Sequence, residues 1–167
     1  MLVKDVMSKE VITVRENETL AQLIAKFRKY NYHTLPVIDN DKKVLGLVNS
    51  EDIMKVYLPH NPVLEELLKS THLYDTEEEN ILEMDLPEDL GTTVKVLDIM
   101  NVNVVIIEDS ETIAEVRKQM KLHNIKRVPV TRNQELVGFI TLFDIIIALF
   151  KERKIIMSKR VINPTSS

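Results

Sequence analysis

Apolar and polar positions follow the same series twice along the chain. A short β-branched run comes first, at residues 11–14 and again at 104–107, and each run predicts a strand. A helix is expected after each run, because apolar residues then recur at helical spacing. In the first series this apolar face consists of Leu20, Leu23, Ile24 and Phe27. We expect Asn17 and Ser110 to cap the two helices.

Each helix is followed by two apolar strands that a short polar turn joins. The expected strands are 35–38 and 44–48 in the first series, and 128–130 and 136–140 in the second. A closing helix then begins near Ser50 and near Leu142. The second closing helix is apolar all round at 145–150, which indicates burial against a partner surface.

The two series are copies of one unit. Residues of the first copy recur in the second at a shift of 93, which becomes 92 after the turn between the apolar strands. Matched pairs include Val3/Val96, Asp5/Asp98, Met7/Met100, Pro36/Pro129, Gly46/Gly138 and Asp52/Asp144. Such self-similarity is the signature of a repeated structural unit. We therefore predict an α/β (α+β) chain made of two βαββα units, each with a small mixed sheet and flanking helices.

The duplication also sets the expected domain limits. They are 1–57 for repeat 1, 58–95 for a connecting insertion, 96–157 for repeat 2 and 158–167 for a flexible tail. Asn61 and Pro62 predict the start of a short helix in the insertion. The eight acids between 75 and 89 are interpreted as a solvated connector. A carboxylate metal site is the sharper alternative, but nothing orders these acids around one centre.

Composition narrows the classes of function. The chain has no cysteine, which excludes disulfides and thiolate metal sites. It shows neither the apolar stretch of a secretory signal nor a window apolar enough for a membrane helix, so we expect a cytoplasmic protein without a membrane partner. The net charge is −4, and without the acidic cluster the chain is only mildly basic, unlike a nucleic-acid binder.

Catalytic motifs are missing from the sequence. None of the four histidines has another at metal-ligand spacing, and the three glycines form no phosphate-binding or nucleophile motif. We therefore expect a protein that is not an enzyme and needs no cofactor or metal.

The corner between the last strand and the closing helix of each copy is the better candidate site. Both copies read Gly, two apolar residues, a polar residue, two further residues and Asp, which places Asp52 and Asp144 in the first helical turn. A helix N-terminus favours an anion such as phosphate, and a carboxylate there can accept two hydrogen bonds from a ribose diol. The same pattern is close to a capping box, which stabilises a helix without any ligand. Both interpretations are open on the motif alone.

The ordered set of motifs resembles a pair of CBS domains. The first copy carries DVM at 5–7, ITV at 12–14, ETL at 18–20, LPV at 35–37 and GLVNSEDI at 46–53. The second carries DIM at 98–100, ETIA at 111–114, IKRVPV at 125–130 and GFITLFDI at 138–145. The resemblance implies a stand-alone CBS pair, or Bateman module, whose repeats are related by a pseudo-twofold axis and enclose two clefts for adenosyl ligands.

The resemblance further implies which residues bind the ligand. Asp144 and Asp52 are expected to hold the ribose, and Thr141 to assist with ribose or phosphate. Asn49 departs from the family pattern at the position of that threonine, so the two sites are expected to differ.

Residues before the Pro-Val strand are expected to contact phosphate. They are Lys126 and Arg127 in the second copy, matched by His33 and Thr34 in the first. The residues expected to border the base are Met7 and Ile12 for one cleft, and Met100 and Val105 for the other. Without the resemblance, an exposed surface position is the simpler interpretation for the polar residues, and core packing for the methionines.

We therefore predict a regulatory module that binds AMP, ADP or ATP, more tightly at Asp144 than at Asp52. S-adenosylmethionine is a weaker candidate, because Lys126 and Arg127 suit a phosphate better than a sulfonium. The alternative from a different class is a scaffold or dimerisation module that binds a protein partner and no nucleotide. A homodimer is expected in either case, because 145–150 would otherwise expose an apolar patch.

Overall fold

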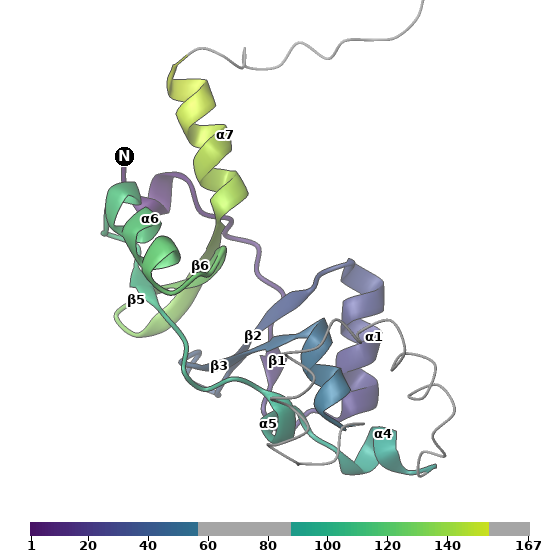
Figure 1. Cartoon of the computed structure of the whole chain (residues 1–167). Coiled ribbons are helices and arrows are strands. Elements are labelled where there is room, and N and C mark those ends of the chain that lie inside the picture. The colour runs from purple at the N-terminus through teal and green to yellow at the C-terminus, as the bar shows by residue number, and fades with distance from the viewer. Residues whose placement is uncertain (57–87, 154–167) are drawn as a thin grey trace, which may run out of the picture. The chain divides into compact units, whose positions relative to one another are not determined.

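The computed structural model describes residues 1–56 and 88–153 (Figure 1). The chain divides into two compact units. The first-repeat unit is Ile12–Val104, and the second-repeat unit is Met1–Val11 with the described chain from Val105 on. The helix predicted at Asn61, most of the acidic run and the predicted 158–167 tail lie outside the described residues.

The first-repeat unit contains a three-stranded mixed sheet in the order β1-β2-β3. Strands β1 and β2 are parallel, whereas β2 and β3 are antiparallel. The elements are β1 (Val14–Arg15), α1 (Leu20–Tyr30), β2 (Thr34–Ile38), β3 (Val44–Asn49), the 3-10 helix η2 (Ser50–Val56), α4 (Leu90–Thr93) and α5 (Val96–Ile99). Helix α1 buries Leu20, Leu23 and Phe27, as its spacing predicts, and ends at Asn31 in the left-handed region.

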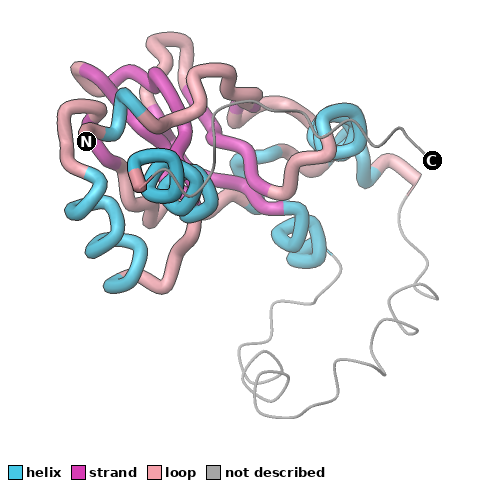
Figure 2. The backbone as a smooth tube through the Cα atoms, turned by 90° about the horizontal axis from the view of Figure 1, so that it is seen from above, coloured by secondary structure: helices cyan, strands magenta, loops and turns pink. Residues whose placement is uncertain are grey.

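The second-repeat unit repeats this plan, with a mixed sheet in the order β4-β5-β6. Its elements are η1 (Val3–Asp5), β4 (Ile107–Glu108), α6 (Ile113–Leu122), β5 (Arg127–Arg132), β6 (Glu135–Thr141) and α7 (Leu142–Glu152). Each unit has the predicted order of strand, helix, two strands and closing helix. Figure 2 shows the helices in cyan and the strands in magenta. The predicted fold class, two βαββα repeats with small mixed sheets, is therefore confirmed.

The opening segment of each repeat packs in the core of the other repeat. Val3 and Met7 belong to the apolar core that contains Ile107 and Ile140, whereas Val96 and Ile99 belong to the core around α1. Backbone bonds tie both segments in equivalent ways, because the N–H of Val3 donates to the carbonyl of Glu111, and that of Val96 to the carbonyl of Glu18. The predicted limits 1–57 and 96–157 follow the sequence repeat. In the structure, residues 1–11 belong to the second-repeat unit and residues 96–104 to the first-repeat unit.

The repeated glycines mark where the exchanged segments cross the last strand of each sheet. A Cβ on Gly46 would lie 2.5 Å from the carbonyl oxygen of Asn101, and one on Gly138 would lie 2.9 Å from that of Ser8 and would clash with the sulfur of Met7. Neither glycine has a positive φ. Glycine is therefore required here by the close approach of another backbone and not by its conformational freedom.

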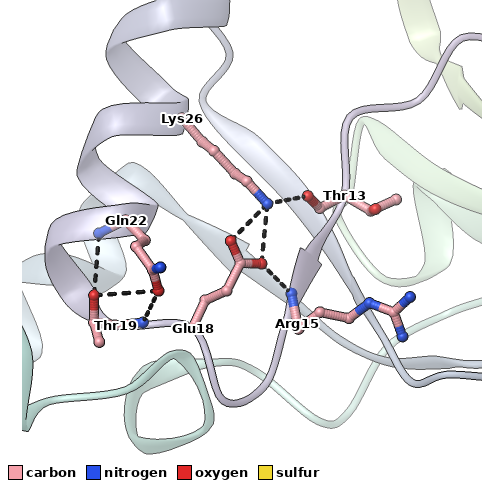
Figure 3. A network of polar contacts seen from close by, with 6 residues as sticks. All are labelled: Thr13, Arg15, Glu18, Thr19, Gln22 and Lys26. Atoms are coloured by element: carbon pink, nitrogen blue, oxygen red, sulfur yellow. Dashed lines mark hydrogen bonds and ion pairs between the residues drawn. The ribbon is translucent and has the colours of Figure 1, made fainter.

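The helix caps differ from those predicted. Thr19 and Thr112, two residues after Asn17 and Ser110, cap α1 and α6 by accepting from the N–H of the residue three positions later. In the first-repeat unit, a turn delays the helix, because the Glu18 carboxylate accepts from the N–H of Arg15 at 2.6 Å (Figure 3).

The first strand of each repeat is also shorter and later than predicted. The expected runs were 11–14 and 104–107, but the paired residues are Val14–Arg15 and Ile107–Glu108. Pairing begins at Val37 and Val130 on the neighbouring strands, directly after Pro36 and Pro129. A proline has no N–H to donate, so the ladder begins after it.

Candidate functional site

Each unit brings two stretches of sequence together at one corner. The Asp144 corner comprises Lys126, Arg127, Thr141 and Asp144. Arg127 is paired with Thr141 across β5 and β6, and the N–H of Leu142 donates to the carbonyl of Lys126 at 2.8 Å. The sheet register therefore holds the start of β5 beside the N-terminus of α7 (Figure 1).

The Asp52 corner is built in the same way in the first-repeat unit. It comprises His33, Thr34, Asn49 and Asp52. Thr34 is paired with Asn49 across β2 and β3, and the N–H of Ser50 donates to the carbonyl of His33 at 3.0 Å. The predicted site residues of each repeat are thus adjacent, although what each carboxylate contacts differs between the repeats.

Thr141 and Asp144 form a reciprocal capping box at the start of α7. The Thr141 hydroxyl oxygen accepts from the N–H of Asp144 at 3.1 Å. The Oδ2 atom of Asp144 accepts from the N–H of Thr141 at 2.8 Å and from its hydroxyl at 2.7 Å. Among the described residues, no group donates to Oδ1 of Asp144, so this oxygen keeps its acceptor capacity for a ligand.

Two cations lie at the start of β5 in the Asp144 corner. Lys126 and Arg127 are both exposed. The ammonium of Lys126 makes no ion pair with any residue in the described part of the chain. The corner therefore combines a half-buried carboxylate with a cation that can bind an anionic group.

Asp52 is buried, with 7% of its surface exposed, and both of its oxygens are bound by protein groups. Oδ2 accepts from the N–H of Asn49 at 2.7 Å and from the side-chain amide of Asn101 at 3.0 Å. Oδ1 accepts from the same amide at 3.2 Å and forms an ion pair with Lys55 at 2.8 Å. The Asn49 side chain does not cap η2, because its oxygen accepts from the Thr34 hydroxyl at 2.8 Å.

The Lys55 ammonium is itself fully coordinated. Besides Asp52, it donates to the carbonyl of Ile99 at 3.1 Å and to the side-chain oxygen of Asn101 at 3.2 Å. An ammonium has three donors, and each has an acceptor here. The sequence analysis did not identify Lys55 or Asn101. The Asp–Lys spacing of three residues signals a helical ion pair, but the contact of Asn101 has no local signal.

The residues predicted to border the base belong to different units. Met7 is buried in the second-repeat unit against Gly138, the glycine of the motif that ends in Asp144. Ile12 belongs to the first-repeat unit, where it packs against the core around α1. Met100 approaches Gly46 in that unit as Met7 approaches Gly138. Both methionines thus pack in or against an apolar core, and their predicted contact with a base stays a prediction.

The described ranges contain no cluster of three or more His, Cys, Asp or Glu side chains suited to a metal ion. None of the helices in those ranges has the length and apolar character needed to cross a membrane. Two pKa shifts lie outside both corners: the Gln119 amide lowers the pKa of Glu115, and the Asp109 carboxylate raises the pKa of Arg132.

Comparison with known proteins identifies relatives over nearly the whole chain. The sequence pattern of the CBS domain matches residues 3–59 and 96–151. The uncharacterized protein MJ1426 of Methanocaldococcus jannaschii is 34% identical over 154 residues, which cover 89% of this chain and 91% of that protein.

Solved structures show the same architecture. The CBS domain pair of protein MJ0100, in complex with 5'-methylthioadenosine and S-adenosyl-L-methionine, is 26% identical with a TM-score of 0.62, over 92% of this chain and 98% of that one. CBSX2 in complex with AMP is similar in fold, with 17% identity and a TM-score of 0.65, over 91% and 98% of the two chains.

Proposed function

Because this chain belongs to the CBS-domain family, we propose that it is a regulatory module that senses an adenine nucleotide and binds it at the Asp144 corner. One observation carries the proposal: Asp144 has an oxygen to which no group of the described residues donates, at a corner that also holds Lys126 and Arg127. A carboxylate accepts hydrogen bonds from the ribose hydroxyls, and cations bind phosphate. This combination matches a nucleoside phosphate such as AMP, ADP or ATP.

Similarity to MJ0100 supports an adenosyl ligand, because that CBS pair was crystallised with two adenosyl compounds. The exposed cations favour a phosphate over the sulfonium of S-adenosylmethionine, since a sulfonium and a lysine repel each other. The proposed module acts in the cytoplasm by binding alone, without catalysis or a cofactor, and passes the signal to a regulated protein.

Calorimetric titration of the full chain with AMP, ADP, ATP and S-adenosylmethionine tests the proposal. We expect Asp144→Asn and Lys126→Met each to weaken nucleotide binding about tenfold or more, since a charge-assisted hydrogen bond contributes about 1.5–3 kcal/mol. Lys43→Met is the matched control, because it removes the same charge from the exposed turn between β2 and β3. A flat response to all four compounds rejects the nucleotide and favours the scaffold alternative.

The apolar face of α7 favours a homodimer as a second property of the module. Phe143, Ile146 and Phe150 are spaced along this helix and are 67%, 37% and 41% exposed in the single chain. A second copy that covers this face would remove the apolar surface from water. We expect sedimentation at tens of micromolar to show a dimer, and Phe143→Glu to shift it to monomer. A monomer in the unmodified chain contradicts this assignment.

A further inference from the structure

We propose that Lys55 and Asn101 keep the Asp52 corner closed to the nucleotide, so that the chain has one working nucleotide site, at Asp144. This inference rests on the proposed function. It assigns to two residues that no motif singles out the role of determining which of the two similar corners binds.

Both oxygens of the Asp52 carboxylate are already bound by protein groups. A ribose diol needs acceptor positions on this group, but both oxygens already accept from Asn101, and Oδ1 is also paired with Lys55. The Asp52 side chain is 9% exposed, so little water reaches its carboxylate. A nucleotide must therefore displace the ammonium and the amide before it can bind Asp52.

Displacement would break several protein contacts at once, and water would replace those of Lys55 in part, because 46% of its side chain is exposed. Lys55 would leave the Ile99 carbonyl and the Asn101 oxygen as well as the carboxylate. Asp52, Lys55 and Asn101 thus form a network in which each side chain contacts the other two. Such a network is most stable when complete, and loss of one member exposes the rest.

The second repeat lacks this network around Asp144 in the part of the chain that the structure describes. By the shift of 92, Lys55 corresponds to Ile147, which has no charge. By the shift of 93, Asn101 corresponds to Ser8. The backbone of Asn101 exchanges hydrogen bonds with Leu47 just as that of Ser8 does with Phe139, so the two residues occupy equivalent places.

Only the side chains at these equivalent places differ. The amide of Asn101 reaches Asp52, whereas the hydroxyl of Ser8 donates to the carbonyl of Glu10 at 3.4 Å and makes no contact with Asp144. The two corners therefore share a sheet register and a carboxylate, although η2 is a 3-10 helix and α7 an α-helix. The pair Lys55 and Asn101 accounts for the additional contacts of the Asp52 carboxylate.

The experiment exchanges the two residues between the repeats. In the full chain we expect AMP to bind with a stoichiometry of about one, and Asp52→Ala to leave its affinity unchanged. The double variant Lys55→Ile with Asn101→Ser should gain a second site. The affinity of AMP for the Asp52 corner should rise ten- to a hundredfold, because the donors of Lys55 and Asn101 no longer compete for the carboxylate. Asp144→Ala in this background should leave only the new site.

The reciprocal variant Ser8→Asn with Ile147→Lys keeps the test decisive should the first double variant unfold. It is expected to weaken AMP binding at Asp144 by at least tenfold while thermal unfolding confirms a folded chain. The inference is overturned if the unmodified protein has two equal sites. It is also overturned if neither exchange changes AMP binding while Asp144→Ala abolishes it, and in both cases the proposed function stands. Absence of AMP binding in every variant overturns both.

Discussion

Replacement of Gly46 by alanine tests whether the exchange of opening segments depends on a glycine at the crossing. The new Cβ would lie 2.5 Å from the carbonyl oxygen of Asn101 and 3.3 Å from its carbonyl carbon, and both of these atoms belong to the backbone. Side-chain rotation cannot relieve such a contact. The crossing segment must move by about 0.5 Å or more to reach the 3.0 Å that real Cβ contacts respect.

This movement would strain the two backbone bonds between Leu47 and Asn101, which are 2.8 and 2.9 Å long. Overpacking of this kind typically costs about 1–3 kcal/mol. For a chain of this size, about 2 kcal/mol corresponds to a loss of roughly 4–8 °C in melting temperature. Gly138→Ala should cost less, because its nearest obstacle is the flexible side chain of Met7 and the backbone oxygen lies at 2.9 Å.

Gly91→Ala is the matched control for the same substitution. Its Cβ would meet only the Cβ of Ala21, at an ordinary 3.4 Å, and the position lies in α4. Alanine there should be neutral or stabilising by about 0.5–1 kcal/mol, since glycine is the poorer helix former. Thermal unfolding followed by circular dichroism gives all three values. Equal melting temperatures for Gly46→Ala and Gly91→Ala would refute the reasoning.

Two further predictions concern polar contacts away from the corners. Lys26 donates to the Thr13 carbonyl and pairs with Glu18 (Figure 3), so Lys26→Met should lower the free energy of unfolding by about 1 kcal/mol in urea titrations, and an unchanged midpoint contradicts this. Gln119→Leu removes the largest cause that lowers the pKa of Glu115, so this pKa should rise toward 4.5 in a carboxyl NMR titration. Because the pKa of Glu115 is lower in the folded state, its carboxylate stabilises the fold at pH values above the unfolded-state pKa. This contribution is lost as the pH falls through the folded-state pKa, so the variant and the parent should converge in stability in acid.

The corner motifs were predictable because their interactions are local. Thr141 and Asp144 are three residues apart, and a capping box needs only that spacing and a helix that follows. The sequence also predicted two strands joined by a short turn, and the observed pairing of the start of β5 with the end of β6 places Lys126 beside α7. The exact start of α1 was not predictable, because a turn stabilised by Glu18 competes with the cap at Asn17.

The exchange of opening segments could not be derived from the pattern of residues. Since Val3 and Val96 stand in the same place of the same motif, each fits the core of either repeat, and apolar periodicity cannot decide between them. The contact of Asn101 with Asp52 was hidden for the same reason, because it exists only once the exchange is made.

Divergence between the copies falls around the two carboxylates, while the positions that build the corners are shared. Both repeats have the proline, the glycine at the crossing and the acid in the first helical turn. The differences at the corners are Asn49 for Thr141, Lys55 for Ile147, Asn101 for Ser8, and His33 and Thr34 for Lys126 and Arg127. Lys55 and Asn101 bind Asp52 directly, and Asn49 alters the cap beside it. The sheet register and the crossing segment place both carboxylates in equivalent positions, so the proposed closure of the Asp52 corner rests on the side chains that surround its carboxylate.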